Sequence, residues 1–258
     1  RSENIPSTPS VAERSPFQTT RRTDHALLRK IALLSILVLL VLKVVGVVLR
    51  GPSPIVLDAA EYWDLGTQVS EGDWLLTGAP IAYRTPGYPW FIGLIRMFSD
   101  RPLFPLVCVQ ALLWIATIGL TASMAVEISG DSRSGWIVAA VSTVMISSVT
   151  YVATILSETV FVFLIVLHLW TLVRYARAPS VLLAFLVGAS LALAILVRPI
   201  AMLIWIADGI YLAASWYGAG WACHQGVCRK RGLAGIAVAG LTAVAITTPW
   251  IVRNQSMF

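Results

Sequence analysis

The sequence predicts an all-α fold, a polytopic bundle of about seven transmembrane helices with interfacial helices in the first extracytoplasmic loop. Two runs of 24 residues, 103–126 and 134–157, contain no charged residue. Each run is long enough to cross roughly 30 Å of hydrocarbon as a helix. Only 12% of all residues are charged, against about 25% in a typical soluble domain. Apolar runs of this length also exclude the alternating strands of a membrane β-barrel.

The expected segments follow from composition along the chain. Residues 1–24 are rich in Ser, Thr and Pro and are expected to form a disordered cytoplasmic tail. Residues 25–258 then form the membrane domain, in which the hydrophilic stretch 50–102 is the longest loop between spans. The expected spans are 31–49, 103–126, 134–157, 159–173, 180–197, 199–218 and 233–252.

The positive charges predict the orientation of these spans. With a cytoplasmic N-terminus, eleven Lys and Arg residues fall on cytoplasmic segments and six on the opposite side, which is the bias expected for this orientation. The loop 50–102 then faces the extracytoplasmic side. The net charge of +6 reflects basic residues at span ends, so we expect no nucleic-acid partner. Lys43, inside the first span, is expected to extend its ammonium group toward the membrane surface.

The first polar motif is an acidic segment in that loop. Asp58, Glu61 and Asp64 spread over an arc of about 120° on a helix, with Tyr62 and Trp63 on the other side. The pattern predicts a helix that lies on the membrane surface with its acids facing a polar cleft. An alternative is that Asp58 is the helix N-cap and Glu61 its capping-box partner.

The second motif is the segment 83–91, which reads Tyr-Arg-Thr-Pro-Gly-Tyr-Pro-Trp-Phe. Two prolines around a glycine predict a rigid turn before an apolar helix. The turn holds Arg84 at the membrane interface, where its guanidinium group can bind a phosphate through two parallel hydrogen bonds. The alternative is that Arg84 only reaches toward lipid headgroups.

Three further ionisable residues, Glu158, Arg198 and Arg253, each stand at the end of an apolar span on the predicted extracytoplasmic side. An ionisable group within a span costs roughly 3 kcal/mol on insertion scales, so such positions indicate a functional site. Snorkelling to headgroups is the alternative for the two arginines. His168 and Asp208 fall inside spans, where we expect polar groups that hydrogen bond between helices.

Taken in order, these motifs resemble the GT-C membrane glycosyltransferases, most closely the bacterial branch of aminoarabinose transferases and protein O-mannosyltransferases. The resemblance rests on D-x-x-E-Y-W, R-T-P-G-Y-P-W-F, L-S-E-T, L-V-R-P and P-W-x-x-R-N, and it runs from Asp58 to the end of the chain. It implies a location in the bacterial inner membrane. Members of the family usually have more spans, so this chain, which ends at Phe258, is expected to lack the C-terminal part.

The resemblance also implies an activity, the transfer of a sugar from a polyprenyl-phosphate carrier in the bilayer to a hydroxyl group of a lipid, glycan or protein. Asp58 corresponds to the family's catalytic aspartate, and Glu61 or Glu158 could assist it. A single general base and direct displacement imply inversion at the sugar carbon. Two neighbouring acids could also bind a divalent metal ion.

The remaining site residues divide between the donor phosphate and the walls of the cleft. The expected phosphate ligands are Arg84, Arg198 and Arg253, and the expected cleft residues are Tyr62, Tyr83 and Tyr88. Two other functions fit a membrane protein with charges at span ends. One is a transporter or flippase of lipid-linked anions, and the other is a non-catalytic, truncated membrane subunit.

Overall fold

The computed structural model describes residues 33–257 except 48, 52, 54, 79–83, 146–150 and 218–225, and the expected N-terminal tail lies outside this part. The described elements are helical, which confirms the all-α class. In chain order they are a first helix Leu33–Val47, α2 (Asp58–Ser70), α3 (Gly87–Met97), α4 (Leu103–Ser129), α5 (Ser132–Val144), α7 (Glu158–Arg177), α8 (Val181–Val197), the 3₁₀ helix η1 (Pro199–Leu203), α9 (Ile204–Tyr217) and α10 (Gly226–Met257).

Within the described residues, three helices are long and apolar enough to cross a membrane, namely α4, α7 and the Ala234–Met257 part of α10. Three further helices are apolar but shorter, Leu33–Val47, Val181–Val197 and Pro199–Ala214. Length and composition therefore indicate a membrane protein. The larger count of seven spans stays a prediction.

The expected single helix over 134–157 is wrong, because α5 ends at Val144 and Met145 turns to an extended backbone with φ −58° and ψ 116°. Lys43 donates hydrogen bonds to the carbonyl oxygens of Thr143 and Met145, the latter at 3.3 Å. An ammonium group is favourable at the carbonyl end of a helix. Lys43 therefore stabilises the end of α5 instead of extending toward the membrane surface.

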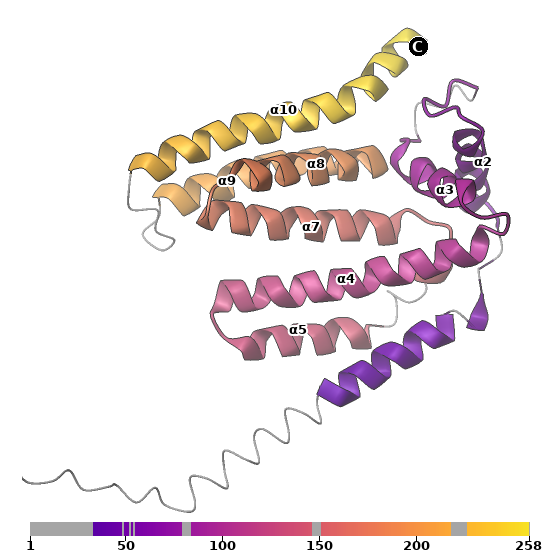
Figure 1. The fold of residues 1–258 in the computed structure, drawn as a ribbon, viewed down its shortest axis with the longest axis horizontal. Helices are drawn as coiled ribbons and strands as arrows, with labels where there is room; N and C mark the ends of the chain where they lie inside the picture. Colours follow the sequence, from indigo (N-terminus) through magenta and orange to yellow (C-terminus); the bar gives the residue numbers. More distant parts are fainter. Residues whose placement is uncertain are drawn as a thin grey trace, which may run out of the picture.

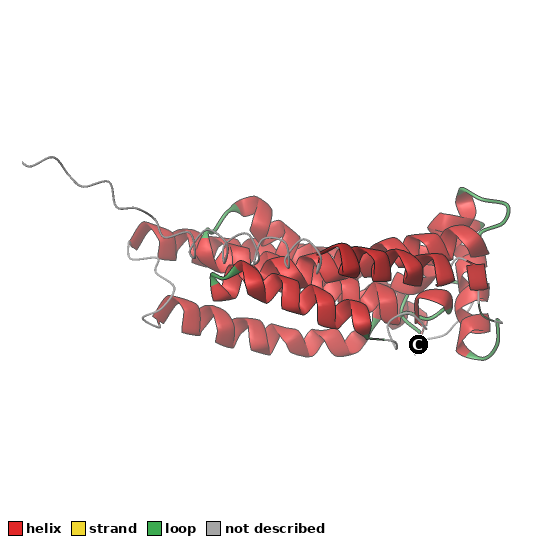
Figure 2. Ribbon diagram, turned by 90° about the horizontal axis from the view of Figure 1, so that it is seen from below, coloured by secondary structure: helices red, strands yellow, loops and turns green. Residues whose placement is uncertain are grey.

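The long helices lie side by side, and α2 and α3 lie together across one end of them (Figure 1). The chain ends at that same end, which is also where α7 begins and α8 stops. Figure 2 shows the molecule from below, with its helices joined by short loops. This arrangement brings segments far apart in sequence to one end of the bundle, close to α2 and α3.

The contact between α8 and α10 depends on Gly188. A Cβ atom added there would lie 2.2 Å from the carbonyl oxygen of Ala239, which is backbone and cannot rotate away. We expect Gly188→Ala to destabilise the protein by about 1–3 kcal/mol and to lower its midpoint of thermal unfolding by about 5 °C.

The matched control is Gly240→Ala, because a Cβ atom at Gly240 would have nothing within 4 Å. Alanine is the better helix former, so this control should leave the unfolding midpoint unchanged or raise it slightly. Thermal unfolding of the purified variants in detergent measures both effects. Equal losses in the two variants would contradict the proposed close approach.

Candidate functional site

Arg84 joins two of the three acids of α2. Its Nη2 lies 2.7 Å from Oδ1 of Asp58, and its Nε lies 2.9 Å from Oε2 of Glu61. Its Nη1 also donates to the hydroxyl oxygen of Tyr62 at 3.4 Å, and the guanidinium carbon lies 4.9 Å from the centre of the Tyr62 ring. Residues 22 to 26 positions apart in sequence thus form one cluster.

The acids reach Arg84 because of the way α2 is buried. Ala59, Tyr62 and Val69 are among the residues that α2 buries, with the spacing of one helical face. Asp58 and Glu61 stand in the first turn, where carboxylates are favourable to the helix dipole. The residue before the helix is Leu57, and no side chain caps it. The alternative in which Asp58 is an N-cap is therefore wrong.

The environment of Arg84 keeps it charged. Partial burial alone would lower its pKa, but the carboxylates of Asp58 and Glu61 act in the opposite direction and raise the pKa of Arg84 above its ordinary value. The Asp58 side chain is 60% exposed, whereas that of Arg84 is 18% exposed. A carboxylate that is open to solvent thus rests on a largely covered guanidinium group.

A second ion pair lies at the facing ends of α7 and α8. Arg198 donates through Nε to the hydroxyl of Ser157 at 2.9 Å and through Nη2 to Oε1 of Glu158. Its guanidinium carbon lies 5.6 Å from the centre of the Phe161 ring. The other carboxylate oxygen of Glu158 is buried and has no hydrogen-bond partner among the described residues. Glu158 thus keeps one acceptor unused.

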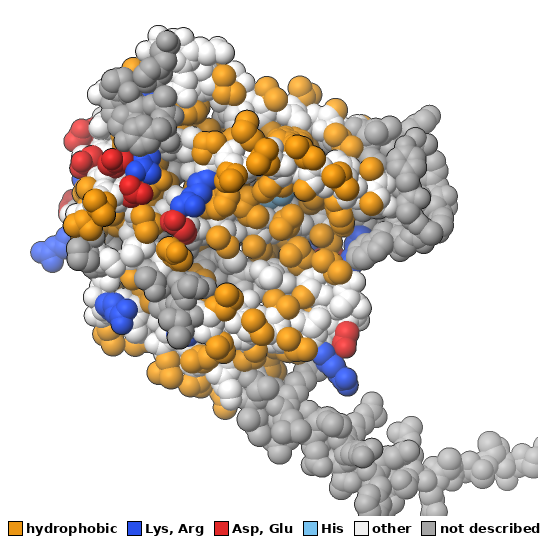
Figure 3. All heavy atoms as spheres, turned by 180° about the vertical axis from the view of Figure 1, so that it is seen from behind, with side chains coloured by type: hydrophobic (Ala, Val, Ile, Leu, Met, Phe, Trp, Pro, Cys, Tyr) orange, Lys and Arg blue, Asp and Glu red, His pale blue; other side chains and the backbone are white. Residues whose placement is uncertain are grey.

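The two ion pairs come from adjacent segments. Thr85, next to Arg84, donates from its hydroxyl to the carbonyl oxygen of Val197, next to Arg198, at 3.0 Å. Gly87 makes this approach possible, since a Cβ atom there would lie 2.7 Å from the backbone of Leu196 and Val197. Figure 3 shows most of the visible charged side chains gathered at one end, beside a surface covered mainly by hydrophobic ones.

The three tyrosines expected in the cleft have different positions. Tyr62 is 8% exposed and contacts Arg84, while Tyr83 lies outside the described residues. Tyr88 is fully buried, and its hydroxyl donates to Oε1 of Gln110 at 3.0 Å. Burial, with smaller contributions from Tyr62 and Glu158, raises the pKa of Tyr88 well above its ordinary value. Tyr88 therefore lies in the core, and a role in lining the cleft stays a prediction.

Arg253 is held by the backbone of the loop that follows α2. Its Nε and Nη2 donate to the carbonyl oxygens of Leu75 at 3.0 Å and Leu76 at 2.5 Å. Only 4% of the residue is exposed, and its guanidinium carbon lies 4.7 Å from the centre of the Trp250 ring. In this structure Arg253 ties α10 to the loop that follows α2. A role on the donor phosphate stays a prediction.

Asp73 closes the loop that receives Arg253. Its carboxylate accepts hydrogen bonds from the backbone amides of Thr77 at 2.9 Å and Gly78 at 2.8 Å. Partial burial raises the pKa of Asp73, but these bonds and the charge of Arg253 outweigh it, and the pKa lies below the ordinary 3.8. The loop stabilisation is therefore complete above pH 3.8 and is lost as the pH falls through the lower, folded-state pKa.

We accordingly expect the amides of Thr77 and Gly78 to lose protection in acid, which hydrogen exchange measures. Because Asp73 is partly solvated, the effect should be about 1 kcal/mol or less, or roughly fivefold in exchange rate. Asp73→Asn should show the faster exchange already at neutral pH. The exposed Glu71→Gln serves as control, and similar acceleration in both variants would contradict the role of Asp73.

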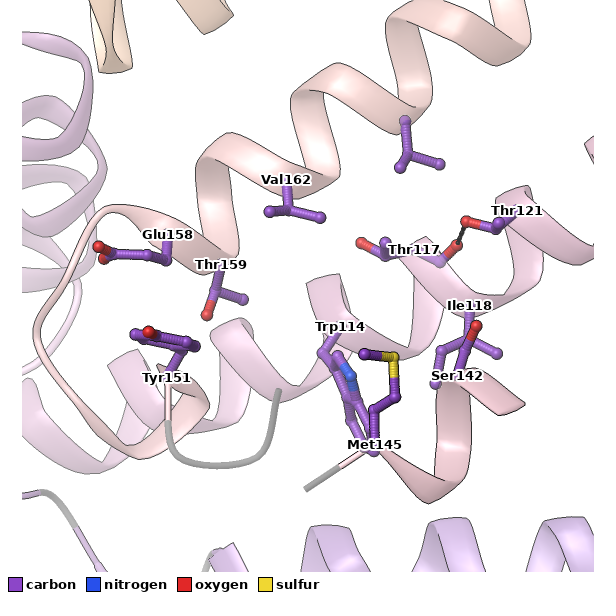
Figure 4. A pocket seen from close by; sticks show the side chains of 11 residues that line it. Trp114, Thr117, Ile118, Thr121, Ser142, Met145, Tyr151, Glu158, Thr159 and Val162 are labelled. Carbon is purple, nitrogen blue, oxygen red and sulfur yellow. Dashed lines mark hydrogen bonds between the residues drawn. The ribbon is translucent and has the colours of Figure 1, made fainter. Parts of the chain in front are cut away.

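A pocket of about 350 Å³ opens beside the second ion pair, between α4, α5 and α7 (Figure 4). Glu158, Thr159 and Tyr151 lie together at one end of it, with Trp114 and Met145 on its apolar wall. Sequence reasoning missed Tyr151 and Thr159. The sequence feature that could have indicated Thr159 is its position directly after Glu158 in the L-S-E-T motif.

A divalent metal has no obvious set of ligands here. Among the described residues, no group of three or more His, Cys, Asp or Glu side chains is placed to hold a metal ion. Asp58 and Glu61 instead share the guanidinium group of Arg84.

No protein-family model matches the chain, and no curated protein or solved structure is similar to it. The resemblance to GT-C glycosyltransferases thus rests on the five sequence motifs. Any activity has to be argued from the residues themselves.

Proposed function

We propose that the chain is a GT-C-type membrane glycosyltransferase that moves a sugar from a polyprenyl-phosphate carrier to an acceptor hydroxyl, with inversion. The observation that supports it most is the placement of two arginine–carboxylate pairs at one end of the bundle. These pairs, Arg84 with Asp58 and Glu61, and Arg198 with Glu158, come from four segments of the chain.

The reaction needs a base on one side of the sugar and an anion-stabilising group on the other. Asp58, with its largely exposed carboxylate, takes the proton from the acceptor hydroxyl as that oxygen bonds to the anomeric carbon. The bond from this carbon to the carrier phosphate breaks at the same time. Arg84 and Arg198 stabilise the negative charge that develops on the leaving phosphate.

Donor binding would also activate the base. In the absence of a donor, Asp58 and Glu61 both occupy Arg84. A phosphate that binds Arg84 bidentately takes over those hydrogen bonds. Asp58 is then released from its hydrogen bond with Arg84 and can accept the proton of the acceptor hydroxyl. The base therefore becomes available only when the donor is in place.

The proposed arrangement in the bacterial inner membrane has seven spans, a cytoplasmic N-terminus and an extracytoplasmic site. Cysteines introduced at the exposed Asp64 and Arg101 should react with a membrane-impermeant maleimide from the extracytoplasmic side. A cysteine at Arg133, at the opposite end of α4, should react only after permeabilisation. The reverse pattern would place Asp58 and Arg84 in the cytoplasm and contradict the proposed site.

The direct test is a transfer assay on the purified chain in nanodiscs. It would be supplied with polyprenyl-phosphate sugars of defined composition and a hydroxyl-bearing lipid acceptor. We expect saturable donor binding and release of free polyprenyl phosphate. The absence of both binding and release across the donor panel would contradict the proposal.

A second candidate function is a transporter or flippase of lipid-linked anions. The observation that favours it is the pair His168 and Asp208, which is buried between helices at 0% and 5% exposure. Intramembrane ionisable pairs are frequent in proton-coupled transporters. Movement of a fluorescent polyprenyl phosphate across a liposome bilayer, without sugar transfer, would favour this function over the first.

A further inference from the structure

His168 lies deep in the helix bundle, where its ring contacts two neighbouring helices, α8 and α9. On α7, His168 stands ten residues after Glu158, which is about 15 Å along the helix axis. Its Nε2 lies 3.1 Å from Oδ2 and 3.2 Å from Oδ1 of Asp208 on α9. Its Nδ1 lies 3.1 Å from the carbonyl oxygen of Val187 on α8. The ring thus has a hydrogen-bond acceptor at each of its two nitrogens.

This geometry determines where protons must be. A carbonyl oxygen can only accept, so Nδ1 must carry a proton to bond Val187. The contact between Nε2 and the Asp208 carboxylate needs a second proton, carried either by the ring or by the acid. In both arrangements the pair is neutral overall and holds one proton more than a neutral histidine beside a carboxylate.

Ser190 offers the one competing arrangement. Its hydroxyl lies 3.5 Å from Nδ1 of His168, so it could in principle donate to an unprotonated Nδ1. The same hydroxyl lies 2.6 Å from the carbonyl oxygen of Leu186, one turn before it on α8. The shorter contact takes the only hydroxyl proton, because a bond at 3.5 Å is at the limit of useful geometry. Nδ1 therefore remains a donor.

Within the part of the chain that the structure describes, no group near the ring could replace the extra proton. Among the described residues, the polar groups that face the ring are Val187 and Ser190 on α8 and Asp208 on α9. No Lys or Arg within that part of the chain makes a salt bridge with Asp208. If the proton left, a buried carboxylate would face the lone pair of Nε2 without compensation, which is strongly unfavourable.

We propose that His168 and Asp208 form a proton-binding site within the bundle, whose bound proton is required to hold α9 against α7 and α8. The ligand is a single proton, shared between Nε2 and the carboxylate. Loss of this proton should release α9. This inference is independent of sugar transfer, because His168 lies about 15 Å along α7 from Glu158.

The test uses the chain with His25→Gln and His224→Gln, which leaves His168 as the only histidine. Nitrogen-15 NMR at pH 7 reports how many protons the ring carries, and infrared spectroscopy detects a protonated carboxyl group. We expect either a doubly protonated ring or a carboxylic acid band that disappears in Asp208→Asn. A singly protonated ring together with the absence of that band would overturn the proposal.

Stability provides a second readout. Asp208→Ala should lower the unfolding midpoint by about 10 °C, because it leaves one partner of a buried pair alone. The double variant His168→Leu, Asp208→Leu removes both partners, so it should recover most of this loss while remaining folded. An equal loss in Asp208→Ala and in the double variant would also overturn the proposal.

Discussion

Asp58→Asn should reduce sugar transfer by about 10²–10⁴-fold, the range typical of losing a general base. Asparagine has nearly the same shape, and its amide oxygen can still accept the hydrogen bond from Arg84 that Asp58 accepts at 2.7 Å. The amide cannot take a proton from the acceptor hydroxyl. Donor affinity should therefore stay within a few fold of the parent, and the loss should appear in kcat.

The fold should tolerate this substitution. The Asp58 side chain is 60% exposed, and ion pairs with such exposure contribute about 0–1 kcal/mol. The control is Asp64→Asn, an exposed acid on the same helix, which should transfer sugar at the parent rate. Steady-state release of polyprenyl phosphate from purified, folded protein measures both variants. Normal turnover in Asp58→Asn would mean that Asp58 serves only to hold Arg84.

The boundaries of several helices could be predicted because the sequence marks them directly. The span expected at 103–126 corresponds to α4, Leu103–Ser129, and that expected at 159–173 corresponds to α7, Glu158–Arg177. Charge-free runs and flanking prolines or charges make such ends visible. The end of α5 could not be predicted, because it depends on Lys43, a residue 100 positions away that bonds Thr143.

For the candidate site, the sequence likewise indicates the residues but not the partners that they contact in the fold. The ionisable residues of the site stand out in the sequence, because they belong to short polar motifs in the loop 50–102 and at the ends of later apolar runs. Their partners do not. The pairing of Arg84 with Asp58 depends on how α2 packs on α3, where Gly93 lies so close that a Cβ atom would be 2.5 Å from Val69.

Arg253 illustrates the limit most clearly. Its partners are the carbonyl oxygens of Leu75 and Leu76, and every residue in a chain carries such a carbonyl. No side-chain pattern can therefore reveal this contact. The arginine of a P-W-x-x-R-N motif has the same appearance in sequence whether it binds backbone or a phosphate.

Arg84→Lys should weaken binding of the polyprenyl-phosphate donor by about 10- to 100-fold, the amount expected for loss of one charge-assisted hydrogen bond. The substitution keeps the positive charge but removes the planar fork that lets Nε, Nη1 and Nη2 contact Glu61, Tyr62 and Asp58 together. A lysine ammonium is a point charge that cannot bind two phosphate oxygens in parallel. Donor titration into nanodisc-embedded protein measures the change.

Arg101→Lys is the matched control, because Arg101 is an exposed arginine just before α4. Lipid attraction depends on charge alone and survives in both variants, so a headgroup contact would leave donor affinity the same in the two proteins. If Arg84 binds the donor phosphate, only Arg84→Lys should bind the donor more weakly than the parent does. The unfolding midpoint should be close to the parent value in both variants, since lysine keeps the positive charge beside Asp58 and Glu61, whose side chains are 60% and 43% exposed. Equal donor affinity in the two variants would assign Arg84 to headgroup contact and remove it from the proposed mechanism.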